Sequence, residues 1–111
     1  MSNIVPTYVV EIHMAGDIED AKRQLRRECY PPGGGLCVTV EPETFIYTGG
    51  EEQGFKLTLR NYPRFPSDPA DLWVRAIGIA DRLIPALCQW TAMVVDPEKT
   101  AWLNHRPEDQ R

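Results

Sequence analysis

Hydrophobic and polar positions alternate over residues 7–14, and this period of two predicts a β-strand. The two faces of the strand carry different chemistry, with Ile12 and Met14 on one side and Glu11 and His13 on the other. The chain is therefore expected to open with a strand that has one core face and one polar face.

Two later stretches repeat apolar residues every three or four positions, which is the period of a helix. The first begins after Asp17, a good N-cap, and must end before residues 31–35, because the sequence Pro-Pro-Gly-Gly-Gly cannot continue a helix. The second begins after Asp68 with Pro69 at its first helical position, and Pro85 should kink or loosen its last turn.

Further extended stretches alternate in the same way as the first. They cover residues 36–41 with a continuation at 45–48, residues 54–60, and residues 90–95. Pro42 interrupts the first of these stretches, and because proline lacks a ladder N–H, it indicates a sheet edge or a bulge. Residues 49–52, Gly-Gly-Glu-Glu, predict the hairpin turn that follows.

The resulting order is strand, helix, strand, strand, helix, strand. With right-handed crossovers this order predicts an α+β fold, a ferredoxin-like βαββαβ sandwich with two helices on one face of an antiparallel sheet. We expect one domain over residues 1–103, with a helical turn at 96–99 and a short flap at 102–103. The polar residues 104–111 are expected to fray.

Composition and charge narrow the class of protein. The 111 residues are 42% hydrophobic and 25% charged, which is average for a globular domain. Twelve Lys and Arg against 16 Asp and Glu give a net charge of −4, which argues against binding nucleic acid through bulk charge. No apolar run approaches the roughly 20 residues that span a bilayer. The first residues also lack the pattern of a signal peptide, so we expect neither a signal peptide nor a membrane span.

The cysteines do not form a recognisable metal or disulfide pattern. Cys29, Cys37 and Cys88 contain no Cys-x-x-Cys pair, and the chain has only two histidines to complete a site. We therefore expect reduced, buried cysteines and no metal. Glycine-rich nucleotide signatures and the Gly-x-Ser-x-Gly elbow are also absent, so no cofactor is predicted and serine hydrolysis is disfavoured.

The sheet face opposite the helices should hold several ionisable side chains as neighbours. Glu11 and His13 lie on the first strand, and Lys56 and Thr58 on the third. Opposite charges paired across strands are the ordinary explanation, and ligand binding is the alternative. General acid–base chemistry by His13 and Glu11 has less support, because alternate strand residues lie about 6–7 Å apart.

The loop after the third strand has the densest recognition chemistry. Two guanidinium groups, an amide and two aromatic rings fall within six positions, and two prolines lower the entropy lost on binding. Arginine and aromatic residues are enriched at protein interfaces, which favours a binding role. The alternative is that the two rings pack against the core and only hold the loop in place. Together with the preceding hairpin, the candidate binding residues are Tyr47, Glu51, Arg60, Asn61, Tyr62, Arg64 and Phe65.

Four motifs stand out when they are taken together. They are Met-Ala-Gly-Asp at 14–17, Gly-Leu-Cys-Val-Thr-Val at 35–40, Phe-Ile-Tyr-Thr-Gly-Gly-Glu at 45–51 and Asn-Tyr-Pro-Arg-Phe-Pro at 61–66. With these motifs the chain resembles, over most of its length, small uncharacterised open reading frames of tailed bacteriophages and prophages. The resemblance implies a bacterial cytoplasm and an accessory protein that binds a host factor, and it transfers no catalytic residue.

These observations favour a non-catalytic protein-interaction module of a phage or prophage, a homodimer that binds a host or phage protein through the candidate residues. The alternative is a protein that binds a nucleotide or another anion with Arg60, Arg64 and the open sheet face. A small enzyme built on His13 and Glu11 ranks below both. Nucleic-acid contact by the basic strip of the first helix comes last, and its residues are Lys22, Arg23, Arg26 and Arg27.

Overall fold

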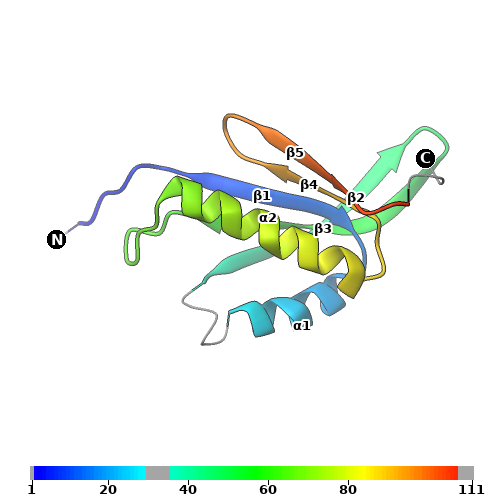
Figure 1. Cartoon of the computed structure of the whole chain (residues 1–111), viewed down its shortest axis with the longest axis horizontal. Helices are drawn as coiled ribbons and strands as arrows, with labels where there is room; N and C mark the ends of the chain where they lie inside the picture. Colours follow the sequence, from blue (N-terminus) through cyan, green and yellow to red (C-terminus); the bar gives the residue numbers. More distant parts are fainter. Residues whose placement is uncertain (1, 30–35, 108–111) are drawn as a thin grey trace.

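The computed structural model describes residues 2–29 and 36–107, so the Pro-Pro-Gly-Gly-Gly segment at 31–35 and the end of the tail lie outside the described residues. The elements are β1 (Val9–Ala15), α1 (Ile18–Glu28), β2 (Val38–Tyr47), β3 (Gly50–Arg60), α2 (Pro69–Ala86), β4 (Thr91–Val95) and β5 (Thr100–Asn104). The strands form one antiparallel sheet in the order β2-β3-β1-β4-β5, with both helices on one face (Figure 1). The predicted α+β class is confirmed.

The sheet contains one strand more than the four we expected. The residues predicted as a flap lie in the middle of β5, which pairs with β4 along its whole length. Residues 96–99 form the turn of this β4–β5 hairpin and no helical turn. The ordered fold also passes the expected boundary at residue 103, because Asn104 ends β5 and the His105 N–H donates to the Trp90 carbonyl at 2.8 Å.

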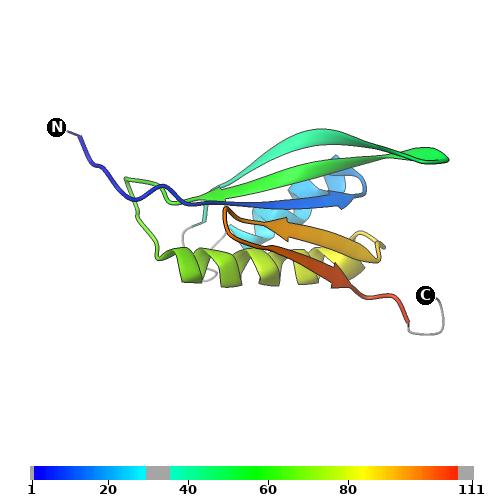
Figure 2. The ribbon, with the colours of Figure 1, turned by 90° about the horizontal axis from the view of Figure 1, so that it is seen from above.

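β2 is one continuous strand that runs through Pro42, where the sequence suggested two pieces. It lies at the edge of the sheet, as the proline predicted. Tyr47 pairs with Gly50, so the turn has two residues, and the second is Gly49 with φ of +92°. Glu51 was expected in the turn but belongs to β3, and the longer hairpin projects beyond both helices (Figure 2).

Both helices begin where the capping residues predict. The Asp17 carboxylate accepts a hydrogen bond from the Glu19 N–H at 2.8 Å, and Asp68 accepts one from the Ala70 N–H at 2.9 Å. Pro85 lies in the last turn of α2. Within the described part of the chain, neither helix combines the length and the apolar character needed to cross a membrane.

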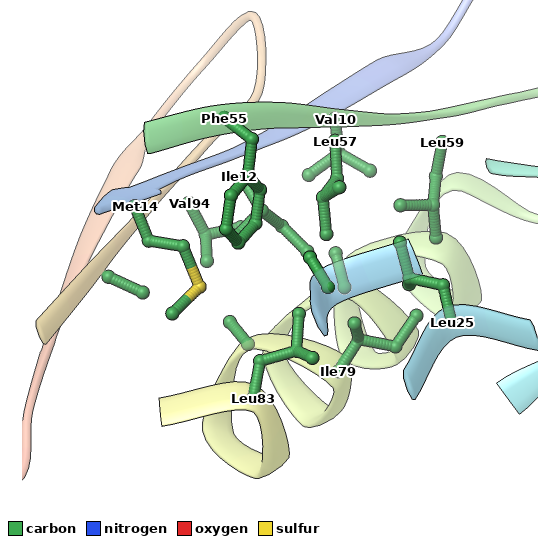
Figure 3. Close-up of a cluster of buried hydrophobic side chains, with 14 of the residues drawn as sticks. Val10, Ile12, Met14, Leu25, Phe55, Leu57, Leu59, Ile79, Leu83 and Val94 are labelled. Carbon is green, nitrogen blue, oxygen red and sulfur yellow. The ribbon is translucent and has the colours of Figure 1, made fainter. Parts of the chain in front are cut away.

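The hydrophobic core lies between the helices and one face of the sheet (Figure 3). The alternation along β1 and β3 and the helical period of α2 supply its side chains, as the sequence predicts. Fully buried members include Val10, Ile12, Phe55, Leu57, Leu59, Ile79 and Ile84. The remaining side chains of the strands point away from the helices, and this open face carries most of the polar chemistry.

Asp96 organises the turn between β4 and β5. Its side chain is 2% exposed and accepts hydrogen bonds from the backbone N–H groups of Glu98 (2.8 Å) and Lys99 (2.7 Å), from Nζ of Lys99 (3.0 Å) and from the Tyr8 hydroxyl (2.9 Å). Burial by itself would raise the pKa of Asp96, but these hydrogen bonds outweigh it and hold the pKa well below its usual range.

We expect Asp96 to make the fold sensitive to acid. A carboxyl group whose pKa is lower in the folded than in the unfolded state adds stability above the unfolded pKa of about 3.9. This stability is lost as the pH falls toward the folded value. In calorimetry from pH 7 to pH 2, the melting temperature of the wild type should fall more steeply than that of Asp96→Asn, and the two should converge in acid. Parallel curves would contradict this role.

Candidate functional site

The open face of the sheet is hollowed near the end of β1 and the start of β4. This open-face cavity has a volume of about 290 Å³. β2 and β5, at the two edges of the sheet, supply aromatic walls, and the strands between them supply most of the floor. The lining residues are His13, Met14, Ala15, Phe45, Tyr47, Glu52, Thr91, Ala92, Met93 and Trp102.

Gly54 shapes one side of this cavity. A β-carbon at position 54 would overlap the carbonyl oxygen of Met14 and would lie 2.5 Å from Cε2 of Phe45. Because glycine has no side chain, the Phe45 ring lies over β3 at this point and reaches toward the centre of the sheet. The glycine in β3 is therefore what lets an aromatic ring of the edge strand line the cavity.

His13 lies on the cavity floor between two carboxylates. Its Nδ1 atom is 2.7 Å from Oε1 of Glu43, and its Nε2 atom is 2.9 Å from Oε1 of Glu11. Carboxylates only accept hydrogen bonds, so a ring nitrogen is the donor in each bond that it makes to a charged carboxylate. The His13 side chain is only 17% exposed, so this arrangement is shielded from most of the solvent.

The expectation that Glu11 and His13 stay beyond hydrogen-bond range is therefore wrong. The side chains of Glu11 and His13 are long enough to lean toward each other, so their ends meet although their β-carbons stay apart. Glu43 of β2 extends across Gly54 of β3 to contact the imidazole ring, and this contact fixes the orientation of the ring. The three side chains thus form one hydrogen-bonded cluster at the cavity floor.

The other two open-face candidates behave differently from each other. Lys56 joins the charged network, with its Nζ atom 3.6 Å from Glu41 and 4.0 Å from Glu11. Thr58 is 2% exposed, because it pairs with Glu11 on one side and Thr39 on the other, so it is not a contact residue. Cross-strand charge pairing explains this part of the face.

Sequence reasoning missed several lining residues. Glu43, Phe45 and Tyr47 lie on one face of β2, because β2 is a single strand. The sequence prediction divided this strand at Pro42, so the alternation that links the three residues was not recognised. Trp102 was missed because a five-residue strand after a turn has a weak pattern.

The loop after β3 is bonded mostly to itself and to the chain that precedes β1. Asn61 donates from Nδ2 to the Pro6 carbonyl at 2.9 Å and accepts from the Ser67 N–H at 2.9 Å. The Tyr62 and Phe65 rings pack with centroids 5.1 Å apart, and the Phe65 N–H donates to the Tyr62 carbonyl at 3.1 Å. The amide and the Tyr62 ring thus hold the loop in shape, which favours the structural interpretation of these residues.

The loop and the β2–β3 hairpin do not neighbour each other, contrary to our expectation. The hairpin turn precedes Gly50 and the loop follows Arg60, at opposite ends of β3 (Figure 2). Ten steps of about 3.3 Å place them roughly 33 Å apart. Neither Arg60 nor the exposed Arg64 lines the open-face cavity; Arg60 instead donates to the Thr39 hydroxyl at 3.0 Å.

The expectation of buried cysteines is wrong for two of the three. All three thiols are free, but Cys37 and Cys88 are exposed because they lie in the connections beside β2 and α2. Burial raises the pKa of the half-buried Cys29 thiol. The Cys37 thiol forms a hydrogen bond with the Tyr62 hydroxyl, and this raises the pKa of Tyr62.

The basic strip of α1 is partly neutralised within the helix itself. Lys22 pairs with Glu19 at 3.1 Å, and Arg23 pairs with Asp20. Such pairs are ordinary for an exposed helix surface. In residues 2–29 and 36–107, no group of three His, Cys, Asp or Glu side chains is arranged to hold a metal ion.

Comparison with known proteins finds a solved structure with a similar fold. No protein-family model matches the sequence, and no curated protein matches it either. A solved structure of a phage SAM lyase in complex with S-methyl-5′-thioadenosine is similar over 94% of this chain and 94% of its own, with a TM-score of 0.62 and 9% identity. The two chains share a fold.

Proposed function

We propose that this protein binds an adenine nucleoside with a thioether or sulfonium group at its 5′ position, and that the open-face cavity is the binding site. The observation that carries the proposal is the combination of aromatic walls with an acidic floor and rim in one cavity. Its volume of about 290 Å³ lies near the lower end of the range for small-ligand sites.

The aromatic walls suit a flat heterocycle. Trp102 is 64% exposed and Tyr47 is 52% exposed, and both line the cavity from opposite edges of the sheet. A base that stacks on one of these rings would cover apolar ring surface that now faces solvent, and such stacking contributes about 1–3 kcal/mol per base. Met93 adds a polarizable thioether to the floor, and a methionine sulfur makes favourable contacts with an aromatic ring.

The charge of the cavity favours a neutral or cationic ligand over a phosphate. Glu52 lines the cavity, and Glu11 and Glu43 lie beside His13. The two loop arginines expected to hold an anion do not line it. We therefore replace the earlier hypothesis of a bound nucleotide or other anion with that of a nucleoside without phosphates.

The fold likeness supports the same choice of ligand, because the similar phage enzyme was solved with S-methyl-5′-thioadenosine bound. We infer from it, and from the motifs of the sequence, that this chain is a phage protein that acts in the bacterial cytoplasm. We also infer that its sheet is a ferredoxin-like sandwich, β2-β3-β1-β4, extended by β5.

Titration calorimetry with S-methyl-5′-thioadenosine, S-adenosylmethionine, adenosine and ATP tests this proposal. We expect S-methyl-5′-thioadenosine to bind and ATP not to bind, because phosphates meet the carboxylates. Trp102→Ala should weaken the binding at least about tenfold, since one stacking surface is lost. Its melting temperature should stay near that of the wild type because the side chain is mostly exposed.

Trp90→Ala is the matched control, because Trp90 is also exposed but does not line the open-face cavity. Equal losses in the two tryptophan variants, or no binding of any of the three ligands without phosphates, would contradict the proposed site.

A second candidate function is binding of a host or phage protein by the tip of the β2–β3 hairpin. Ile46 is 79% exposed there, next to the exposed Tyr47, on a segment that projects beyond the helices (Figure 2). Exposed apolar side chains on a projecting segment are typical of protein contacts. This candidate function becomes the favoured one if none of the three ligands without phosphates binds.

A further inference from the structure

The two edges of the sheet differ in how well they are protected against pairing with another strand. The edge at β2 carries Pro42 between Glu41 and Glu43, and charges and proline are common devices that block an edge. The edge at β5 reads Thr-Ala-Trp-Leu-Asn and has neither a charge nor a proline. β5 is therefore the edge that remains chemically open to another strand.

Apolar side chains flank this open edge on both sides of the sheet. Trp102, 64% exposed, lies on the open face, and Val74 of α2, 68% exposed, lies on the helix side. Asp81 of α2 bonds to His105, just beyond the end of β5, with 2.6 Å between Oδ1 and Nε2. Val74 also lines a groove with Lys99 of the β4–β5 turn.

We propose that β5 pairs in antiparallel fashion with β5 of a second copy of this chain, so that two five-strand sheets join into one. In an antiparallel pair, residues directly opposite each other point to the same face of the sheet. A two-fold axis between two copies of β5 must therefore pass midway between the two copies of one residue, which lie opposite each other. Centring the axis on Trp102 uses all of β5 and stacks two indole rings on the open face. This proposal does not depend on the nucleoside site.

Charge complementarity favours this register. With Trp102 on the axis, Thr100 lies opposite Asn104 of the partner subunit. Just beyond the strand ends, Lys99 faces His105 of the partner subunit, and one step further Glu98 of the turn approaches Arg106 of the partner subunit, where both are exposed. The two-fold axis creates this pair of opposite charges twice and sets no like charges opposite each other within β5. Opposite charges across paired strands are favourable, and like charges are not.

Light scattering and sedimentation of the full chain, over about 10–500 µM, test the proposal. The wild type should have twice the 12.6 kDa mass of the chain. Thr100→Lys with Asn104→Lys sets lysine opposite lysine twice and should raise the dissociation constant at least about tenfold. Thr100→Glu with Asn104→Lys changes the same two exposed positions but sets glutamate opposite lysine, so it should remain a dimer.

Melting curves confirm that both double variants are folded, because both side chains are exposed. A wild type that is monomeric over the whole range would overturn the proposal. So would a dimer that the two lysines do not weaken, because the contact would then lie elsewhere. A folded glutamate–lysine variant that is monomeric would also overturn it, because this pairing predicts two favourable contacts there.

Discussion

Alanine at position 54 should lower the free energy of unfolding by about 3 kcal/mol, because there is no room for a methyl group. Its β-carbon would overlap the Met14 carbonyl oxygen, which is held in the ladder between β1 and β3, and would lie 2.5 Å from the ring of Phe45. A backbone atom in a central strand cannot move aside cheaply, so β1 and β3 must separate or the ring must leave. Urea denaturation measures the change.

Gly78→Ala is the matched control for this experiment. A β-carbon at Gly78 in α2 would lie 3.1 Å from Nη1 of Arg82, the far end of a flexible side chain that can move. Alanine is also the better helix former by about 1 kcal/mol, so this variant should be at least as stable as the wild type. Equal stability of Gly54→Ala and the wild type would show that Phe45 does not lie over β3 as described.

His13→Ala should cost about 2 kcal/mol of stability, because it leaves Glu11 and Glu43 side by side without the group that donates to both. Adding Glu43→Gln should recover part of the loss, since it removes one of the two facing charges. A double-mutant cycle in urea measures this coupling. The loss of the floor histidine should also weaken any ligand held in the open-face cavity.

The other histidine of the chain provides the comparison. His105 lies 2.6 Å from Asp81, but Asp81 is 61% exposed, and exposed pairs contribute at most about 1 kcal/mol. His105→Ala should therefore cost less than His13→Ala, although both lose a contact with a carboxylate. Equal costs for the two variants, or no coupling between His13 and Glu43, would contradict the shielded network on the open face.

Local patterns in the sequence were enough to predict most elements and their faces. Asp17 and Asp68 marked the helix starts, and the period of two along β1 separated the core side of Ile12 from the open side of His13. These predictions succeed because capping and periodicity depend on residues a few positions apart. The edge position of β2 also followed from one residue, Pro42, because proline lacks the N–H that an inner strand needs.

The hairpin and the last strand were harder to predict for a physical reason. A run of Gly-Gly-Glu-Glu is compatible with several turn positions, and the register of β2 against β3 decides that Gly49 turns while Glu51 pairs. β5 has five residues, too few for its alternation to be distinctive, and it exists as a strand because β4 offers an edge. Whether an edge is available is a property of the whole sheet.

The open-face cavity is a product of tertiary structure alone. Its key residues are Phe45 of β2, Gly54 of β3, His13 of β1 and Trp102 of β5, and they come together only when the strand order and every register are set. The same order separates the β2–β3 hairpin from the loop after β3, which lie close in the sequence but at opposite ends of one strand. The sequence by itself determined the elements and the two faces of the sheet, because those depend on near neighbours. Only the tertiary structure decided which side chains share a site, because pairing across the sheet is a long-range property of the chain.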